Sequence, residues 1–168
     1  MGLRDVLRVA GWTVLPNMGS LAGFYVIQAN SDDFQLKFDI ARRFPKGNSQ
    51  VAIWTAFNVG MGYSAYLVHR DGGGLDGQAR VPIAFYLVSL SCNWAWPAFF
   101  YDRTKFAIAL LDTVALCCAI GALTAMYRPI NTMAAILTLP CLSWSLYVTL
   151  FTYRVWKHGH RRKWRGVK

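Results

Sequence analysis

Five long apolar segments, separated by short polar links, constrain the fold of this chain more than any other feature. They cover about residues 6–28, 49–69, 81–101, 104–127 and 131–156. Each holds close to the roughly 20 residues that a helix needs to cross a ~30 Å hydrocarbon layer at ~1.5 Å per residue. In lipid, a helix satisfies its own backbone hydrogen bonds. The pattern therefore predicts an all-α membrane protein, with residues 1–168 forming one domain, a bundle of five transmembrane helices.

Composition favours this interpretation over the main alternative, a soluble all-α globule with buried helices. Of 168 residues, 55% are hydrophobic and only 15% are charged, whereas soluble domains carry about 25% charged residues. The four cysteines all fall within apolar segments and match neither a disulfide framework nor a metal pattern. We expect them to be small packing residues.

The chain offers no constellation typical of a hydrolase or a metalloenzyme. It has no HExxH motif and no paired carboxylates within the apolar segments, and its three histidines lie at segment ends or in the tail. We therefore predict no catalytic residues and no metal site. Asp112 is the one acid well inside an apolar segment, where a carboxylate is costly and thus a functional candidate. A structural hydrogen bond to a neighbouring helix is the interpretation we favour for it.

Charge predicts the orientation of the bundle. With five crossings, the links 29–48 and 102–105 share one side with the end of the last segment and the basic tail 157–168. That side holds 13 of the 18 lysines and arginines. The positive-inside rule then places the C-terminus in the cytosol. The tail could bind nucleic acid, but contact with anionic membrane lipid is the simpler use, and we expect no nucleic-acid partner.

Small residues at helical spacing predict close helix approach. Gly19 and Gly23 lie one turn apart in the first segment, and the second segment carries a ridge of Ala52, Ala56, Gly60 and Ser64. We expect a neighbouring helix to pack on this ridge.

The link 29–48 is the longest between segments and is either functional or mobile. Its mixed charges and its phenylalanines, Phe34, Phe38 and Phe44, suggest a flap over one mouth of the bundle; a solvated loop is the alternative.

Aromatic and amide side chains line up on three of the predicted helices. The stripes are Asn93, Trp96 and Phe100, then Trp54 and Asn58, then Trp144, Val148 and Phe151. Buried indoles offer flat apolar walls and one N–H donor each, which suits a planar, mostly apolar ligand with polar edges. On composition alone, plain core packing is the interpretation that we favour for the same residues.

Three motifs, in this order along the chain, favour the ligand-site interpretation: "IWTAFNVGMGYSAYLVHRDGGG", "CNWAWPAFF" and "INTMAAILTLPCLSWSLYVTLFTYRVWK". Together they resemble the translocator protein family, also called the tryptophan-rich sensory protein (TspO/MBR) or peripheral-type benzodiazepine receptor family. The resemblance spans about residues 12–158. It implies a five-helix membrane protein with a cavity that binds porphyrins, such as protoporphyrin IX or heme, and sterols such as cholesterol. No obligatory cofactor is implied.

The resemblance also implies site residues and a setting. Trp54, Asn58, Asn93, Trp96, Trp144 and, more loosely, Val148 match ligand-pocket positions of the family. Leu150, Tyr153 and Lys157 match its sterol-recognition pattern, which is short and degenerate. Homodimers and the mitochondrial outer membrane are typical of animal members, with the endoplasmic reticulum or another cell membrane as the alternative location.

The chain departs from the family pattern at several positions. The WxPPxW stretch is replaced by "RRFPKGNSQVAIW", in which Pro45 is the one remaining proline. Ile108 replaces a tryptophan, Asn58 a tyrosine and Thr152 an asparagine. These changes indicate a divergent member in which drug-type ligands bind poorly.

Three classes of function follow. We expect a ligand-binding receptor or transport protein for tetrapyrroles and sterols. The alternatives are an enzyme that degrades porphyrin in light and a structural or interaction protein that works through its dimer face and tail.

Overall fold

The computed structural model describes residues 2–37, 45, 47–102 and 104–165, and within these ranges it contains helices and no strand. The elements are α1 (Leu3–Lys37), α2 (Gly47–Asp71), the short 3₁₀ turn η2 (Gly74–Asp76), α3 (Arg80–Phe100), α4 (Phe106–Tyr127) and α5 (Thr132–Arg165). The prediction of an all-α bundle is confirmed.

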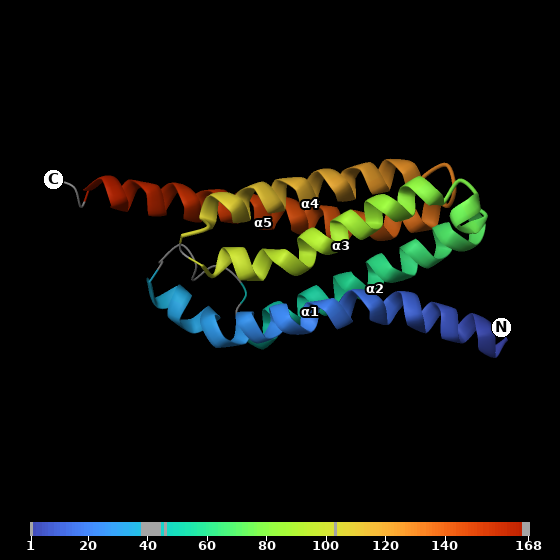
Figure 1. Ribbon diagram of the computed structural model, residues 1–168, viewed down its shortest axis with the longest axis horizontal. Coiled ribbons are helices and arrows are strands. Elements are labelled where there is room, and N and C mark those ends of the chain that lie inside the picture. Colours follow the sequence, from blue (N-terminus) through green and yellow to red (C-terminus); the bar gives the residue numbers. More distant parts are fainter. Residues whose placement is uncertain (1, 38–44, 46, 103, 166–168) are drawn as a thin grey trace.

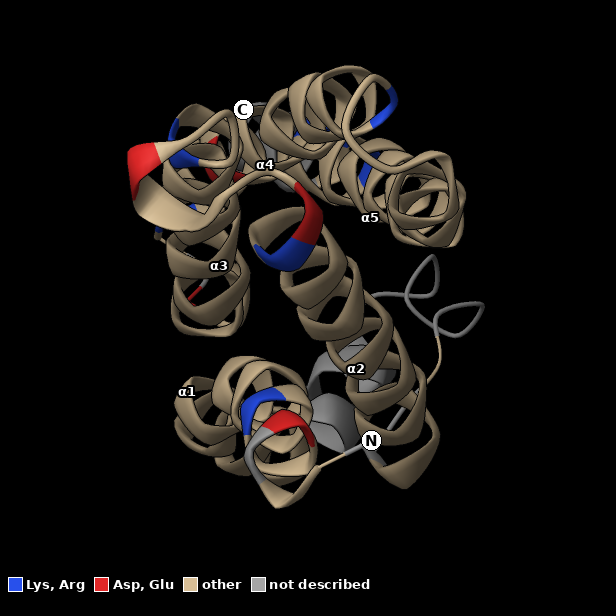
Figure 2. Cartoon of the chain, turned by 90° about the vertical axis from the view of Figure 1, so that its right-hand side faces the viewer, with Lys and Arg blue, Asp and Glu red and all other residues tan. Residues whose placement is uncertain are grey.

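The helices run up and down along one common axis (Figure 1). Helix α1 packs on α2 and α3, helix α4 packs between α3 and α5, and α2 also contacts α5. Viewed along the bundle, α1 lies with α2 on one side, and α3, α4 and α5 lie on the other (Figure 2). Helices α2 and α3 each contact three other helices, and both join α1 to the rest of the bundle.

Four helices are long and apolar enough to cross a membrane, over residues 48–71, 80–100, 106–127 and 132–158 of the part that the structure describes. Their outward faces carry large apolar side chains, such as Leu111 (69% exposed) and Leu150 (61% exposed). Such contiguous apolar exposure suits lipid. Helix α1, which carries Arg8, Pro16 and Asn17, packs against α2.

Two predicted boundaries are wrong. Helix α1 continues to Lys37 rather than ending near residue 28, and α5 continues to Arg165 rather than ending near 156. Residues 29–37 contain neither glycine nor proline, so backbone hydrogen bonding continues after the apolar pattern stops. The predicted flap is thus partly helix, with Phe34 inside α1, while Phe38 and Phe44 lie outside the described residues.

Helices α1 and α2 approach closely one turn before Pro16, at the backbone carbonyl of Trp12. A proline has no N–H, so the carbonyl of Trp12, four residues earlier, loses its helical donor. Gly62 of α2 lies against this carbonyl, and a Cβ at residue 62 would collide with it. The close contact therefore needs glycine on α2.

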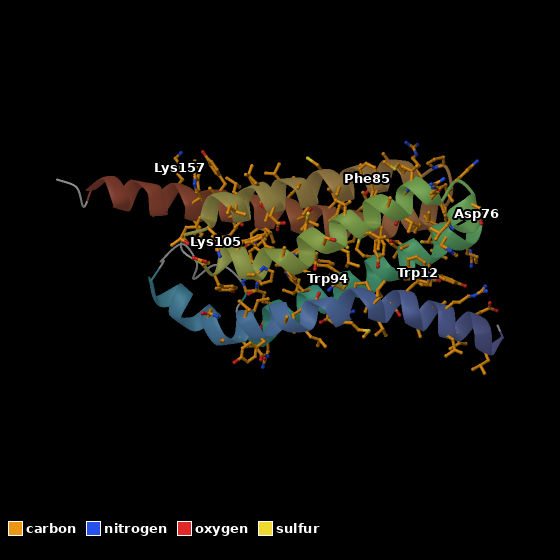
Figure 3. All side chains as sticks on the ribbon, in the orientation of Figure 1. Trp12, Asp76, Phe85, Trp94, Lys105 and Lys157 are labelled. Atoms are coloured by element: carbon orange, nitrogen blue, oxygen red, sulfur yellow. The ribbon has the colours of Figure 1, made fainter. Side chains whose placement is uncertain are left out.

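The close approach predicted at Gly19 and Gly23 is confirmed. The ring of Trp94, which reaches from α3 toward α1 (Figure 3), lies against Gly19, and a Cβ on Gly23 would stand 3.0 Å from Cγ of Pro97. Both contacts join α1 to α3.

Unlike Gly19 and Gly23, most of the small-residue ridge on α2 makes no close contact with another helix of the structure. Ala52 and Ala56 are exposed, and a Cβ on Gly60 would have no described atom within 4 Å. Of the four residues, Ser64 alone is buried. No described helix of this chain packs closely on Ala52, Ala56 or Gly60, and Gly62, on another face of α2, makes the close contact with α1 instead. Packing against a second copy stays a prediction.

The described parts of the segments predicted to share one side lie at one end of the bundle. Lys105, before α4, and Lys157, near the end of α5, lie toward that end, and Asp76 lies at the opposite end (Figure 3). The arrangement of the helices thus agrees with the charge pattern used to orient the chain.

Candidate functional site

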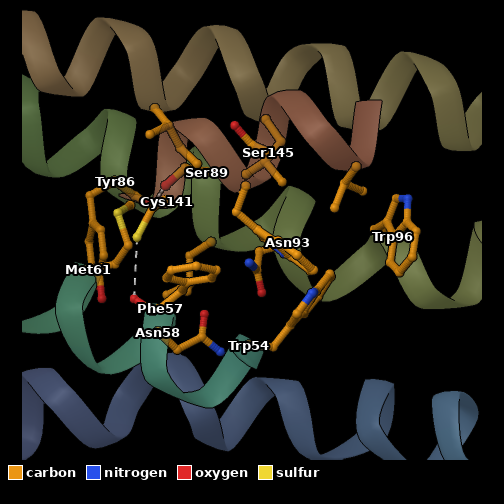
Figure 4. Close-up of a pocket in the computed structure, with 15 residues that line it drawn as sticks. Trp54, Phe57, Asn58, Met61, Tyr86, Ser89, Asn93, Trp96, Cys141 and Ser145 are labelled. Atoms are coloured by element: carbon orange, nitrogen blue, oxygen red, sulfur yellow. Dashed lines mark hydrogen bonds between the residues drawn. The ribbon is translucent and has the colours of Figure 1, made fainter. Parts of the chain in front are cut away.

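A cavity of about 40 Å³ lies among α2, α3, α4 and α5 (Figure 4). All six residues that the sequence assigned to a ligand pocket line it: Trp54, Asn58, Asn93, Trp96, Trp144 and Val148. They come from three helices and from positions up to 94 residues apart in the chain, so tertiary packing alone brings them together. Their role in binding a ligand stays a prediction.

Stacked aromatic rings form one wall of the cavity. The Trp54 and Trp96 ring centroids are 5.2 Å apart, and Trp96 stacks on Phe100 at 4.5 Å with an interplanar angle of 20°. Phe57 and Trp144 form a further pair at 5.7 Å. Trp96 is fully buried. Offset and tilted ring pairs of this kind are favourable, and they present flat apolar surface to whatever occupies the cavity.

The buried polar atoms on this lining that lack a hydrogen-bond partner among the described residues include two at the aromatic wall. These two are the indole N–H of Trp54 and the side-chain oxygen Oδ1 of Asn93, both buried. An unsatisfied buried polar group costs about 1–3 kcal/mol. A ligand that accepts from Trp54 and donates to Asn93 would recover part of that cost.

Asn58 lines the same cavity, but its amide is engaged elsewhere. Nδ2 of Asn58 donates to Oγ of Ser20 at 3.0 Å and is 3.4 Å from Oδ1 of Asn17, both on α1. A second polar tie joins α1 to α3, because Nε1 of Trp94 donates to the Pro16 carbonyl at 2.9 Å. Asn58 therefore ties α2 to α1 inside the membrane, which distinguishes it from Asn93.

The residues that match the family's sterol-recognition pattern lie apart from the cavity. Leu150 and Tyr153 are exposed on α5, at 61% and 42%, and Nζ of Lys157 is 5.7 Å from the centre of the Tyr153 ring. None of the three lines the cavity. A sterol bound to this pattern would lie on the outer surface of the bundle.

Asp112 is half-buried on α4 and lies beside the thiol of Cys92 on α3, also outside the cavity. Its Oδ2 has no hydrogen-bond partner among the described residues. The contact with Cys92 agrees with the interpretation that Asp112 joins two helices.

The four cysteines are free thiols. No cluster of three His, Cys or Asp side chains that could hold a metal ion occurs in the described ranges. Cys141 lines the cavity, and its Sγ lies 3.6 Å from the Phe57 carbonyl oxygen.

Sequence reasoning missed several lining residues, notably Met61, Tyr86, Ser89 and Ser145. Ser89 and Tyr86 precede Asn93 by four and seven residues, so they extend the Asn93–Trp96–Phe100 stripe toward the start of α3. The same helical spacing would have found them.

These features define a class of protein: a polytopic α-helical membrane protein with an aromatic cavity enclosed among its helices. Residues 12–157 match the TspO/MBR family. The chain is 30% identical to human translocator protein over 156 residues, which is 93% of this chain and 91% of the relative. It is 29% identical to sheep translocator protein over 91% of this chain and 90% of the relative. Mouse translocator protein 2 is 34% identical over 62% of this chain and 65% of that relative.

The chain therefore belongs to the TspO/MBR family. It is an integral multi-pass membrane protein of the translocator or ligand-binding kind.

Proposed function

We propose that the chain binds flat, mostly apolar polycyclic ligands in the cavity, namely porphyrins such as protoporphyrin IX or heme and sterols such as cholesterol. The observation that carries this proposal is the pair of unpartnered groups, the Trp54 N–H and the Asn93 oxygen, on an aromatic wall. Membership of a family whose relatives are named translocator proteins supports the same conclusion.

The size of the cavity adds a condition. At about 40 Å³, it holds no more than a few water molecules. A polycyclic ligand therefore enters only when lining side chains move apart. Two ring pairs would separate: Trp54 and Trp96, now 5.2 Å apart, and Phe57 and Trp144, now 5.7 Å apart. The ligand would then pack against the ring faces that this movement exposes.

The test replaces wall residues and measures affinity. Trp96→Leu and Trp144→Leu remove aromatic area and an N–H donor but keep the site apolar. We expect each to weaken protoporphyrin IX binding by about ten- to hundredfold, equivalent to roughly 1–3 kcal/mol. Calorimetry or absorbance titration of the purified protein in detergent is the readout, because quenching fails when tryptophans are removed.

Trp156→Leu is the matched control. Trp156 lies on α5, like Trp144, but does not line the cavity, so its replacement should leave affinity near that of the parent. If both wall variants bind protoporphyrin IX as tightly as the parent does, these tryptophans serve only in packing and the proposal is overturned.

Porphyrin breakdown in light is the second candidate, favoured by the contact between the oxidisable indoles of Trp54 and Trp96. Illuminating the complex and following the porphyrin spectrum tests it. Loss of the porphyrin bands that depends on these two tryptophans would support the enzyme, and a spectrum that decays equally without protein would exclude it.

We further propose a homodimer in the mitochondrial outer membrane with its C-terminus in the cytosol. The exposed face of Ala52, Ala56 and Gly60 supports the dimer, because small residues allow close helix contact in lipid. The basic end of the bundle supports the orientation. The location rests on resemblance to animal members.

A further inference from the structure

The cavity has a polar group that neither the sequence motifs nor the aromatic wall account for: the hydroxyl of Tyr86. Tyr86 lines the cavity and is completely buried, and its hydroxyl has no hydrogen-bond partner among the described residues. Tyr86 sits opposite Met61 and near Cys141, at the end of the cavity remote from Trp96 (Figure 4). An unpartnered hydroxyl in a membrane interior is costly.

Nearby polar side chains leave this hydroxyl available. The Ser89 hydroxyl donates to the Tyr86 backbone carbonyl at 2.7 Å, and the Ser145 hydroxyl donates to the Leu142 carbonyl at 2.8 Å. Both serines are thus satisfied by their own helices. Of these three lining side chains, Tyr86 is therefore the one with hydrogen-bonding capacity to spare.

Two features of the lining define the chemistry of a molecule that would use it. None of the lining residues carries a charge, and burying a carboxylate or an ammonium without a partner is prohibitively costly. Tyr86 and Asn93 lie seven residues apart on α3, about 10 Å along the helix, with apolar Leu90 between them. The two polar positions thus bracket an apolar stretch.

We infer that Tyr86 forms a polar subsite at the end of the cavity remote from Trp96. This subsite selects ligands whose end beside Tyr86 is neutral and bears a hydroxyl. The inference rests on the proposed function, since it concerns the same cavity. It makes Tyr86 a specificity-determining residue: an alcohol fits at the remote end, and the carboxylates of a porphyrin are directed away from it.

The experiment compares two ligands that differ by one hydroxyl. Cholesterol and cholest-5-ene, the same polycycle without its 3-hydroxyl, are titrated into the full chain in detergent micelles by calorimetry. We expect the parent to prefer cholesterol by about three- to tenfold, the range of one net hydrogen bond. Tyr86→Phe should abolish this preference by weakening cholesterol binding and leaving cholest-5-ene binding unchanged.

Tyr127→Phe is the matched control. Tyr127 is likewise fully buried with an unpartnered hydroxyl, but it does not line the cavity, so the preference for cholesterol should persist. Neither variant removes a hydrogen bond that the described structure contains, so melting temperatures should stay at or above that of the parent.

The outcomes separate the inference from the proposed function. Equal affinity of the parent for the two ligands, or a preference that survives Tyr86→Phe, overturns the subsite while leaving ligand binding intact. Failure of the parent to bind protoporphyrin IX and both polycycles overturns the proposed function, and the subsite with it.

Discussion

Asn58 and Asn93 are both amides on the cavity lining, yet their surroundings give them different roles. Asn58 donates to Ser20 at 3.0 Å across the α1–α2 interface, whereas Oδ1 of Asn93 has no partner among the described residues. The sequence motifs assign both residues to one ligand pocket. The hydrogen bonds indicate that one amide holds helices together and the other is available to a ligand.

Replacing each asparagine by leucine should therefore give opposite results. Asn58→Leu removes the contacts to α1 and leaves Ser20 and Asn17 without this partner, so we expect a loss of about 0.5–2 kcal/mol in the free energy of unfolding. Asn93→Leu should leave stability unchanged or raise it, and should weaken porphyrin binding. Thermal unfolding in detergent, paired with absorbance titration, measures both. Equal destabilisation by the two changes would contradict the distinction.

Asp102 illustrates how a local turn outside the membrane responds to pH. Its Oδ1 accepts from the Thr104 hydroxyl at 2.7 Å and from the Thr104 backbone N–H at 3.0 Å. Its Oδ2 lies 2.9 Å from Nζ of Lys105. These contacts, the Thr104 hydroxyl first among them, lower the pKa of Asp102 to about 2, from about 3.9 for a free side chain.

Because the folded-state pKa is lowered, the stabilisation from Asp102 is present above about pH 4 and is lost as the pH falls toward 2. We expect the carboxyl carbon of Asp102 to titrate near pH 2 by NMR. Asp102→Asn should remove this pH dependence of the α3–α4 turn. A titration midpoint near 4 would show that the turn does not hold the carboxylate.

At the scale of the element, two of the glycines in α2, Gly60 and Gly62, have contrasting environments. Gly62 lies against the Trp12 carbonyl of α1, whereas a Cβ on Gly60 would meet open space. The two residues are separated by one position, so they face different sides of the helix.

Substitution at these glycines separates folding from association. Gly62→Ala should lower the folded yield, because its methyl group would collide with a backbone carbonyl that cannot move away cheaply. Gly60→Leu and Ala56→Leu should leave the monomer folded and reduce the dimer fraction. Sizing in detergent and thermal unfolding measure the two effects. If both leucine variants dimerise like the parent, this face contacts lipid rather than a second copy.

At the scale of the whole molecule, the charges at the two ends of the bundle predict its orientation. A protease-sensitive tag placed after Lys168 should be cleaved when protease is added to intact organelles, because the positively charged end faces the cytosol. A tag placed before Met1 should be protected under the same conditions. The reverse pattern, with the C-terminal tag protected until detergent is added, would overturn the orientation.

The sequence by itself determined the number and type of helices and the aromatic positions on them. An apolar segment of membrane length can be predicted to be helical from its own residues, since each helix satisfies its own backbone hydrogen bonds in lipid. The spacing of Asn93, Trp96 and Phe100 likewise predicts that these residues share one face of their helix. The sequence was less informative about helix ends, because polar residues after an apolar segment can continue a helix, as residues 29–37 do.

Tertiary structure decided which of these residues meet. It gathered Trp54, Trp96 and Trp144 from three helices around one cavity, and it placed Leu150 and Tyr153 on the outer surface. It turned Asn58 toward α1, moved the close helix contact from Gly60 to Gly62, and left the Tyr86 hydroxyl buried and unpartnered. None of this is local, because the partner of each side chain depends on how neighbouring helices are rotated and how deeply they pack.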